Sequence, residues 1–141
     1  MRSMANAVAV WVGVIAAIGI VLATPRVWAN WWSPPAFATE RTLQLRTKCR
    51  DEGERWSRER FVVIDGQMYV RLSSRMAARV QCNAIHPLLG VEVAGLRFEH
   101  VRGVPVPLLA ERVAKAMADK YTTDVLVRLF PHPLTLLLIA E

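Results

Sequence analysis

An apolar segment near the N-terminus constrains the fold of this chain more than any other feature. Residues Ala7 to Ala23 are apolar throughout, and no charged residue occurs between Ser3 and Pro25. At a rise of about 1.5 Å per residue, about 20 helical residues cover the ~30 Å hydrocarbon core of a bilayer. An aromatic belt at the headgroup level follows, formed by Trp28, Trp31 and Trp32. We therefore expect a transmembrane anchor with its aromatic belt in residues 1–32, in contact with membrane lipid.

A cleaved signal peptide is the alternative, because Ala29 offers a small residue after an apolar run. The run is longer than the ~7–15 residues of a signal peptide's apolar region, and Trp28 is an awkward neighbour for a cleavage site. Arg2 on one side nearly balances Arg26 and Arg41 on the other, so the positive-inside rule leaves the orientation open. We expect a single-pass membrane protein with its soluble domain on the cytoplasmic side.

The rest of the chain has the length of one small domain. The motif Ser33-Pro34-Pro35 cannot continue a helix, and residues 33–40 are expected to be a short stiff linker. Residues 41–141 then form a domain of about 100 residues, which is enough for one modest hydrophobic core. Oligomerisation or a bound ligand would add stability to a domain of this size.

The charge of the chain points to an anionic partner. The formal net charge is +6, and fifteen of the eighteen basic residues are arginine. The planar guanidinium suits phosphate and carboxylate groups, so a phosphate-bearing cofactor, an acidic lipid or a nucleic acid could bind. Nucleic acid is not expected, because few exposed aromatic residues alternate with the arginines. An arginine-rich composition that reflects only a GC-rich genome remains an equal alternative.

The two cysteines, Cys49 and Cys82, form no CxxC motif and have no metal-binding spacing with histidine. We expect neither a disulfide framework nor a metal site. Cys49 falls at an inward position of an expected strand, and Cys82 lies in an expected helix. Both are interpreted as small buried apolar residues.

Hairpin signals dominate the first half of the domain. Residues Thr42 to Arg50 alternate between apolar and cationic positions, which predicts a half-buried strand. Asp51 to Glu59 is charged and contains Gly53, so we expect a mobile loop. Two apolar runs then flank Asp65-Gly66, a dipeptide typical of a type I′ turn, which predicts an antiparallel hairpin.

The second half adds two helices and three strands. A helix is expected over Arg75 to His86 with an N-cap at Ser73-Ser74, and a clearer one over Leu108 to Tyr121. A second hairpin is centred on Ala94-Gly95, and the run Leu134 to Ile139 predicts a strand buried on both faces. We therefore expect an α+β fold, a small antiparallel β-barrel of six strands with two helices.

Several of these segments resemble a known family. They are the basic first strand Leu45 to Arg50, the hairpin FVVIDGQMYVR, a helix ending in His86-Pro87, and the sequences Gly95-Leu96-Arg97-Phe98 and Ala118-Asp119-Lys120-Tyr121. Together they look like the deazaflavin-dependent nitroreductase and quinone reductase family, over residues 42–141. The resemblance implies the FMN-binding split-barrel fold of pyridoxamine-phosphate oxidase-like proteins. It also implies FMN or a deazaflavin coenzyme as cofactor, and a homodimer with the cofactor between the subunits.

Two groups of residues could hold such a cofactor. Arg46, Lys48 and Arg50 project from one face of the first strand at ~6–7 Å spacing, which suits a phosphate, although a solvated edge-strand face would look the same. The second group lies on the third strand and at the following helix N-terminus, where simple capping is the alternative. Its members are Tyr69, Arg71, Ser73 and Ser74.

Two functions follow from these observations. The first is a membrane-anchored oxidoreductase that transfers hydride from a flavin or deazaflavin to a lipophilic quinone-like or nitro acceptor. No set of Ser, His and Asp residues is required, because the cofactor would carry the chemistry. The second is a non-catalytic split-barrel accessory or ligand-binding subunit of a membrane complex. It is favoured by acidic residues in the loop meant for the phosphate, which are Asp51, Glu52 and Glu54.

Overall fold

The structure is a computed structural model that describes residues 31–123 and 131–141. The expected transmembrane segment lies outside the described residues, and no helix among those described is long and apolar enough to cross a membrane. The strands are β1 (Leu43–Cys49), β2 (Gly53–Glu59), β3 (Phe61–Ile64), β4 (Gln67–Leu72), β5 (Leu88–Val93), β6 (Leu96–Pro105) and β7 (Leu134–Ala140). The helices are α1 (Ser74–Cys82) and α2 (Ala110–Lys120), with short 3₁₀ turns η3 (Pro34–Phe37) and η4 (Pro107–Leu109).

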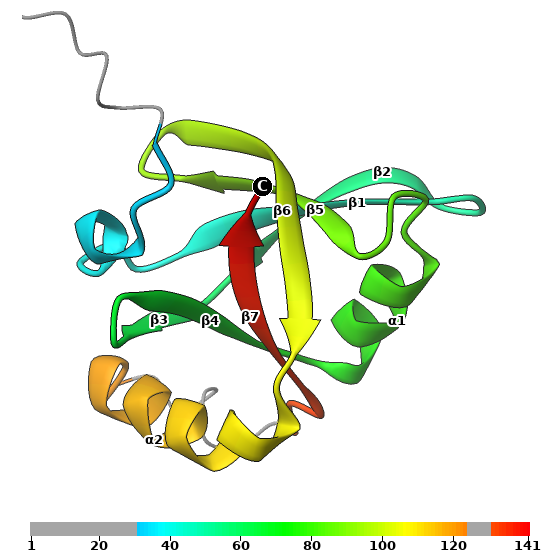
Figure 1. Cartoon of the computed structure of the whole chain (residues 1–141). Coiled ribbons are helices and arrows are strands. Elements are labelled where there is room, and N and C mark those ends of the chain that lie inside the picture. Colours follow the sequence, from blue (N-terminus) through cyan, green and yellow to red (C-terminus); the bar gives the residue numbers. More distant parts are fainter. Residues whose placement is uncertain (1–30, 124–130) are drawn as a thin grey trace, which may run out of the picture.

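The seven strands of the described residues form one antiparallel sheet in the order β2-β1-β5-β6-β7-β4-β3. Its two edge strands, β2 and β3, are consecutive in the chain and are joined by Arg60 alone. The sheet therefore curls until its edges meet at this connection, which gives the split β-barrel seen in Figure 1. The expected α+β split barrel with two helices is confirmed for the described residues.

Two tight turns define the hairpins as expected from the sequence. Asp65 and Gly66 both have positive φ, 50° and 76°, and the turn joins β3 to β4. Ala94 and Gly95 also have positive φ, 52° and 75°, and join β5 to β6. Both central residues of a type I′ turn require this conformation.

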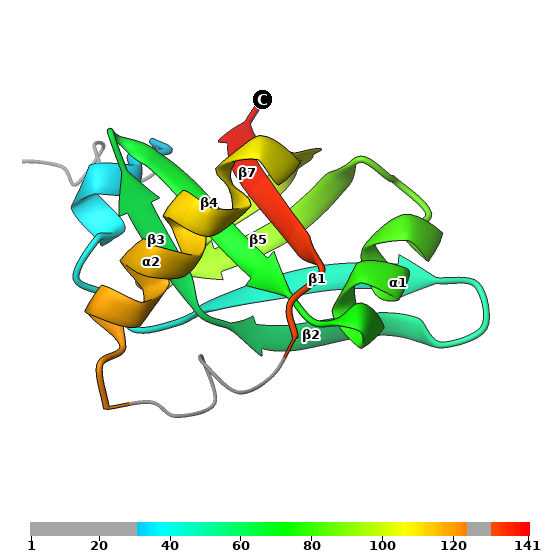
Figure 2. The same ribbon diagram turned by 90° about the horizontal axis from the view of Figure 1, so that it is seen from below.

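The barrel interior holds the larger of two apolar clusters. Inward side chains of β1, β4, β5 and β7 fill it, among them Leu45, Val70, Val91 and Leu136. The second cluster lies outside the barrel, where α2 packs on β3 and β4 (Figure 2) through Val62, Tyr69, Val113, Met117 and Tyr121. The Tyr121 hydroxyl group fixes the end of α2, because it donates to the carbonyl of Arg41 at 2.6 Å and accepts from the amide of Phe61 at 3.2 Å.

Two expected elements differ from the structure. The expected loop Asp51 to Glu59 is wrong from Gly53 onward, because β2 pairs with β1 along its whole length. The expected helix Arg75 to His86 is shorter, since α1 ends at Cys82 and Asn83 leaves the helical conformation with ψ of 130°. The strand expected over Leu134 to Ile139 is β7, which lies between β6 and β4. Leu136 and Leu138 are buried, but Ile139 is 41% exposed, so the expected burial on both faces does not reach the end of the strand.

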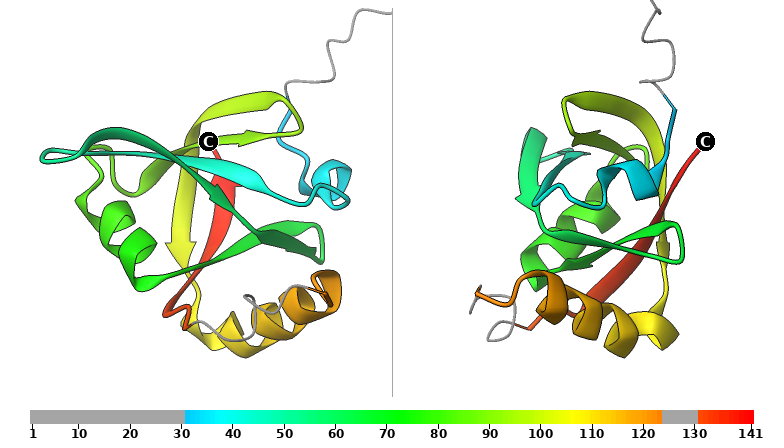
Figure 3. Two further views of the ribbon diagram at one scale, coloured as in Figure 1. Left: turned by 180° about the vertical axis from the view of Figure 1, so that it is seen from behind. Right: turned by 90° about the vertical axis from the view of Figure 1, so that its left-hand side faces the viewer.

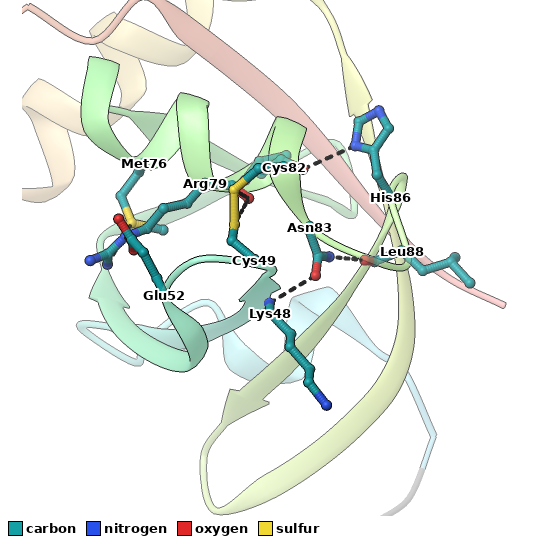
Figure 4. The surroundings of a disulfide bond; sticks show 10 residues. Lys48, Cys49, Glu52, Met76, Arg79, Cys82, Asn83, His86 and Leu88 are labelled. Carbon is teal, nitrogen blue, oxygen red and sulfur yellow. Dashed lines mark hydrogen bonds and ion pairs between the residues drawn. A yellow bond between two sulfur atoms is a disulfide. The ribbon is translucent and has the colours of Figure 1, made fainter.

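The cysteines form a disulfide bond, so their interpretation as two separate buried apolar residues is wrong. Cys49 at the end of β1 is bonded to Cys82 at the end of α1, with their Cα atoms 5.2 Å apart. The separation of 33 residues hid this pairing, because contact between a strand end and a helix end depends on the tertiary fold. The bond ties α1 to the hairpin formed by β1 and β2, which is called the first hairpin below (Figure 4).

Candidate ligand-binding groove

A groove of about 270 Å³ opens between the first hairpin and the connection from α1 to β5. It is lined by Arg46, Lys48, Glu54, Asn83, Ala84 and Ile85. The cationic strand predicted from the sequence therefore borders a concave surface. This differs from the alternative, in which its cations would lie on a flat, solvated face. Figure 4 shows the Lys48 side chain extending away from the disulfide and from α1.

Asn83 holds the far wall of the groove to β1. Its Oδ1 atom accepts from the amide of Lys48 at 2.9 Å, and its Nδ2 atom donates to the carbonyl of Leu88 at 2.7 Å. The amide of Ala84 completes the link by donating to the carbonyl of Lys48 at 2.9 Å. Because Asn83 is buried and makes both bonds, this wall is fixed in the folded protein.

Arg46 lies flat across the neighbouring strand. A Cβ atom at Gly90, the residue opposite, would stand 2.8 Å from the Arg46 Nε atom, so only glycine leaves room for it. The guanidinium carbon lies 5.5 Å from the centre of the Trp56 ring, and the guanidinium forms an ion pair with Glu99. Arg46 is therefore positioned, but its charge is already partly balanced.

Lys48 is the exposed cation of the groove. Within residues 31–123 and 131–141, no carboxylate lies at ion-pair distance from its ammonium group. Arg50, predicted with it, falls in the turn after β1 and is not among the lining residues. Of the three predicted cations, Arg46 and Lys48 therefore line the groove, and Arg50 lies in the turn.

The acidic residues of this hairpin do not all face the groove. Glu52 accepts from the Arg79 Nε atom at 3.1 Å, which directs its carboxylate towards α1. Glu54 lines the groove and lies directly across the strand pair from Lys48. Glu54 is therefore the acidic residue that lines the groove and would repel an anion bound there.

The second predicted group lies elsewhere. Tyr69 is buried under α2, and its hydroxyl donates to Gln67 Oε1 at 3.0 Å. The Ser73 hydroxyl oxygen accepts from the Met76 amide at 3.3 Å, which is the capping role weighed as its alternative. Ser74 is exposed as the first residue of α1, and Arg71 borders a different cavity. The structure does not bring these residues to the groove.

That other cavity is small, about 30 Å³, with room for about two water molecules. It is lined by Glu59, Arg60, Arg71, Met117 and His132. Burial raises the pKa of Glu59 to about 7, against a partial opposing effect of Arg60 and Arg79, and burial also lowers the pKa of Arg71. The cavity is too small for a cofactor, and no group of residues suited to a metal ion occurs in the described part of the chain.

Several residues that shape the groove were missed by the sequence reasoning. Glu54 and Trp56 were assigned to the expected loop Asp51 to Glu59, because the segment that forms β2 has no alternation of apolar and polar residues. Asn83 and Glu99 gave no local signal, since their partners lie 35 and 53 residues away.

Comparisons with known proteins bear on the fold. No protein-family model matches the chain, and no curated protein matches it significantly. Several solved structures are similar, among them the following three. The conserved hypothetical protein Rv2991 from Mycobacterium tuberculosis is 18% identical, with a TM-score of 0.57 over 80% of this chain and 83% of that one. HutZ, the heme storage protein from Vibrio cholerae, is 22% identical, with a TM-score of 0.51 over 76% and 87%.

The third is an F420-H2 dependent reductase, FDR-A, which is 13% identical, with a TM-score of 0.50 over 71% of this chain and 95% of that chain. All three have the split-barrel fold of pyridoxamine-phosphate oxidase-like proteins. At these identities the similarity shows the fold alone.

Proposed function

We propose that this chain is an oxidoreductase-like split-barrel protein that binds FMN or a deazaflavin coenzyme through its phosphate at the groove. Hydride would pass to a lipophilic acceptor, quinone-like or nitro, and the expected membrane anchor would keep the protein near such a molecule. The observation that carries the proposal is the exposed Lys48 ammonium at a concave surface beside the positioned guanidinium of Arg46. One structure of this fold is named as an F420-H2 dependent reductase, which is compatible with it.

The residues fit the phosphorylated part of the cofactor better than its ring system. Sites for whole drug-sized ligands usually enclose about 300–1,000 Å³, and this groove has about 270 Å³. Lys48 and Arg46 would hold the phosphate by charge-assisted hydrogen bonds. When bound, the cofactor supplies the hydride chemistry, and the protein binds and orients it. The ring would rest on surface outside the groove, which a second copy in a homodimer could provide.

An absorption spectrum tests the proposal directly. Protein purified in mild detergent should carry a flavin or deazaflavin band, or should acquire one when FMN or the deazaflavin coenzyme is added. If neither coenzyme is present and neither binds, the proposal fails.

Paired variants locate the binding site. Lys48→Ala should weaken coenzyme binding by about 1.5–3 kcal/mol, the usual contribution of a charged hydrogen bond, while Lys115→Ala on the exposed side of α2 should have no effect. Arg50→Ala should have a smaller effect than Lys48→Ala, because Arg50 does not line the groove. Equal affinities for all these variants would contradict the assignment.

The acidic residues provide a second matched pair. Glu54→Gln should tighten binding of the phosphorylated coenzyme, most at low salt, where Coulomb interactions are least screened. Glu52→Gln should leave the affinity unchanged, because that carboxylate is paired with Arg79 outside the groove. Ligand titrations at two ionic strengths measure both.

A non-catalytic accessory or ligand-binding subunit is the second candidate. The ion pair of Arg46 with Glu99 and the presence of Glu54 in the groove favour it, since both reduce the positive charge available to a phosphate. One structure of this fold is named as a heme storage protein, which is compatible with a ligand-binding role. This candidate predicts a protein without coenzyme that co-purifies with a stable partner.

A further inference from the structure

The segment that joins the expected anchor to the barrel is packed against the barrel. The Trp32 ring meets Phe98 edge-on, with ring centres 5.0 Å apart, and lies 6.2 Å from Phe37. Phe37 is 4% exposed and belongs to the barrel core. The turn η3 between them is closed by a hydrogen bond from the amide of Ala36 to the carbonyl of Ser33 at 2.9 Å. The barrel therefore holds Trp32, which was expected in the aromatic belt of the anchor, and η3, which lies within the expected linker.

An apolar surface surrounds this attachment. A hollow of about 190 Å³ is lined by Trp32, Pro34, Gly66, Gln67, Leu137, Leu138 and Ile139. Beside it, Ile139 is 41% exposed, and Trp31, which precedes Trp32, is 71% exposed. We call Trp31, Ile139 and this hollow the Trp31 face. Single exposed apolar residues are ordinary, but two of them beside a hollow with a mostly apolar lining mark a surface that usually has an occupant.

The length of the preceding chain limits what can occupy the face. The apolar segment ends at Ala23, and from there the fully extended chain reaches Trp32 over at most about 30 Å. A domain of about 100 residues has a diameter of roughly 34 Å, from a radius of gyration of about 13 Å. A bilayer that holds residues 7–23 therefore cannot lie at the end of the barrel opposite to Trp32. In both views of Figure 3 the described chain begins on the side away from α2, although η3 itself contacts β3 and β4, the strands on which α2 packs.

We propose that the Trp31 face rests on the lipid bilayer, with Trp31 at the headgroup level and the apolar part of a lipid in the hollow. An indole ring suits this boundary because its body is apolar and its N–H group can bond to water or headgroups. Because Trp32 and Phe37 fix the attachment, the barrel would be held in one orientation. The inference rests on membrane insertion of residues 7–23 and is independent of any cofactor.

Spin labels on the full-length protein in lipid nanodiscs test the orientation. Ile139→Cys would be labelled beside the hollow, and Leu108→Cys would serve as the matched control, because Leu108 is 98% exposed in η4 next to α2. The unsubstituted protein should take up no label, since both native cysteines are disulfide-bonded. The label at residue 139 should collide more with oxygen, which partitions into lipid, than with a water-soluble nickel chelate. The label at residue 108 should show the reverse.

Three results would overturn the inference. The first is equal nickel accessibility at the two positions. The second is strong dipolar broadening between labels at residue 139, which would mean that a second copy covers the face. The third is a protein that lacks its first 29 residues by mass and does not associate with nanodiscs. None of these results bears on coenzyme binding, which the absorption spectrum measures separately.

Discussion

Gly90 is the residue that allows Arg46 to lie across the sheet. In Gly90→Ala the added Cβ atom would stand 2.9 Å from the Arg46 Cβ atom and closer still to its Nε atom. We expect this overpacking to lower the free energy of unfolding by about 1–3 kcal/mol in urea titrations. Because the clash is with Arg46, Gly90→Ala should lower the free energy of unfolding by less when it is combined with Arg46→Gly. Purely additive losses would contradict this explanation.

Glu59 should make stability depend on pH. Burial raises its pKa from 4.5 to about 7 in the folded protein, so the folded state binds more protons than the unfolded state between these values. Its contribution to stability is full below about pH 4.5 and is lost as the pH rises through about 7. Glu59→Gln should reduce the change in the free energy of unfolding between pH 5 and pH 7.5. The same substitution at the exposed Glu111 should leave this pH dependence unchanged. An unaltered slope in Glu59→Gln would disprove this role.

Single residues were predictable from the sequence where local chemistry decides their role. The alternation that placed Arg46 and Lys48 on an outer face is confirmed, and so is Ser73 as a cap. The charge balance of Arg46 was not predictable, because Glu99 reaches it from β6 through sheet pairing. Arg50 was misplaced because the strand ends one residue earlier than its pattern indicates.

At the scale of elements, the disulfide holds α1 against the first hairpin. Closing a loop of 33 residues in the unfolded chain should stabilise the fold by about 3–4 kcal/mol. Urea unfolding with a reductant should show a loss of this size. The double variant Cys49→Ala, Cys82→Ala should begin at the lower stability and respond no further to reductant, so a response there would point to another cause.

Elements with strong local turns were the easiest to predict. Both hairpins follow from dipeptides that adopt positive φ, and each is confirmed. β2 was missed because it is an edge strand whose side chains are mostly exposed, so it has no apolar alternation. The predicted helix extended beyond the end of α1, because that end depends on Asn83. The Asn83 side chain forms hydrogen bonds with β1 and with Leu88 rather than with the helix.

For the whole molecule, the disulfide bears on the side of the membrane. Disulfides persist in oxidising compartments and are rare in the cytosol, so the bond favours the side opposite to the cytoplasmic position expected from the sequence. When cells are lysed with a thiol-blocking reagent, the Cys49–Cys82 bond should be recovered intact by mass spectrometry. Two blocked thiols instead would support the cytoplasmic position.

A homodimer remains a prediction. A domain of about 100 residues has a modest core, and pairing would extend both the core and the surface beside the groove. The full-length protein in detergent should sediment with the mass of two copies after correction for bound detergent. A monomer at micromolar concentration would contradict the prediction.

The barrel as a whole could be predicted because hairpin-linked strands leave few topologies. The pairings that close it join distant segments, β1 with β5 and β4 with β7, and no local pattern specifies them. The groove depends on these pairings, which explains why its cations could be predicted and its walls could not.

The position of β7 has a consequence for synthesis. It is the last strand along the chain, yet it lies between β6 and β4 in the middle of the sheet. While residues 134–140 are still inside the ribosome, β4 and β6 have no neighbour on that side, and their backbone groups remain open to water or to other chains. Closure is therefore a late event that follows emergence of nearly the whole domain, and chaperones would meet two separate parts of the sheet, β2-β1-β5-β6 and β4-β3, rather than a barrel.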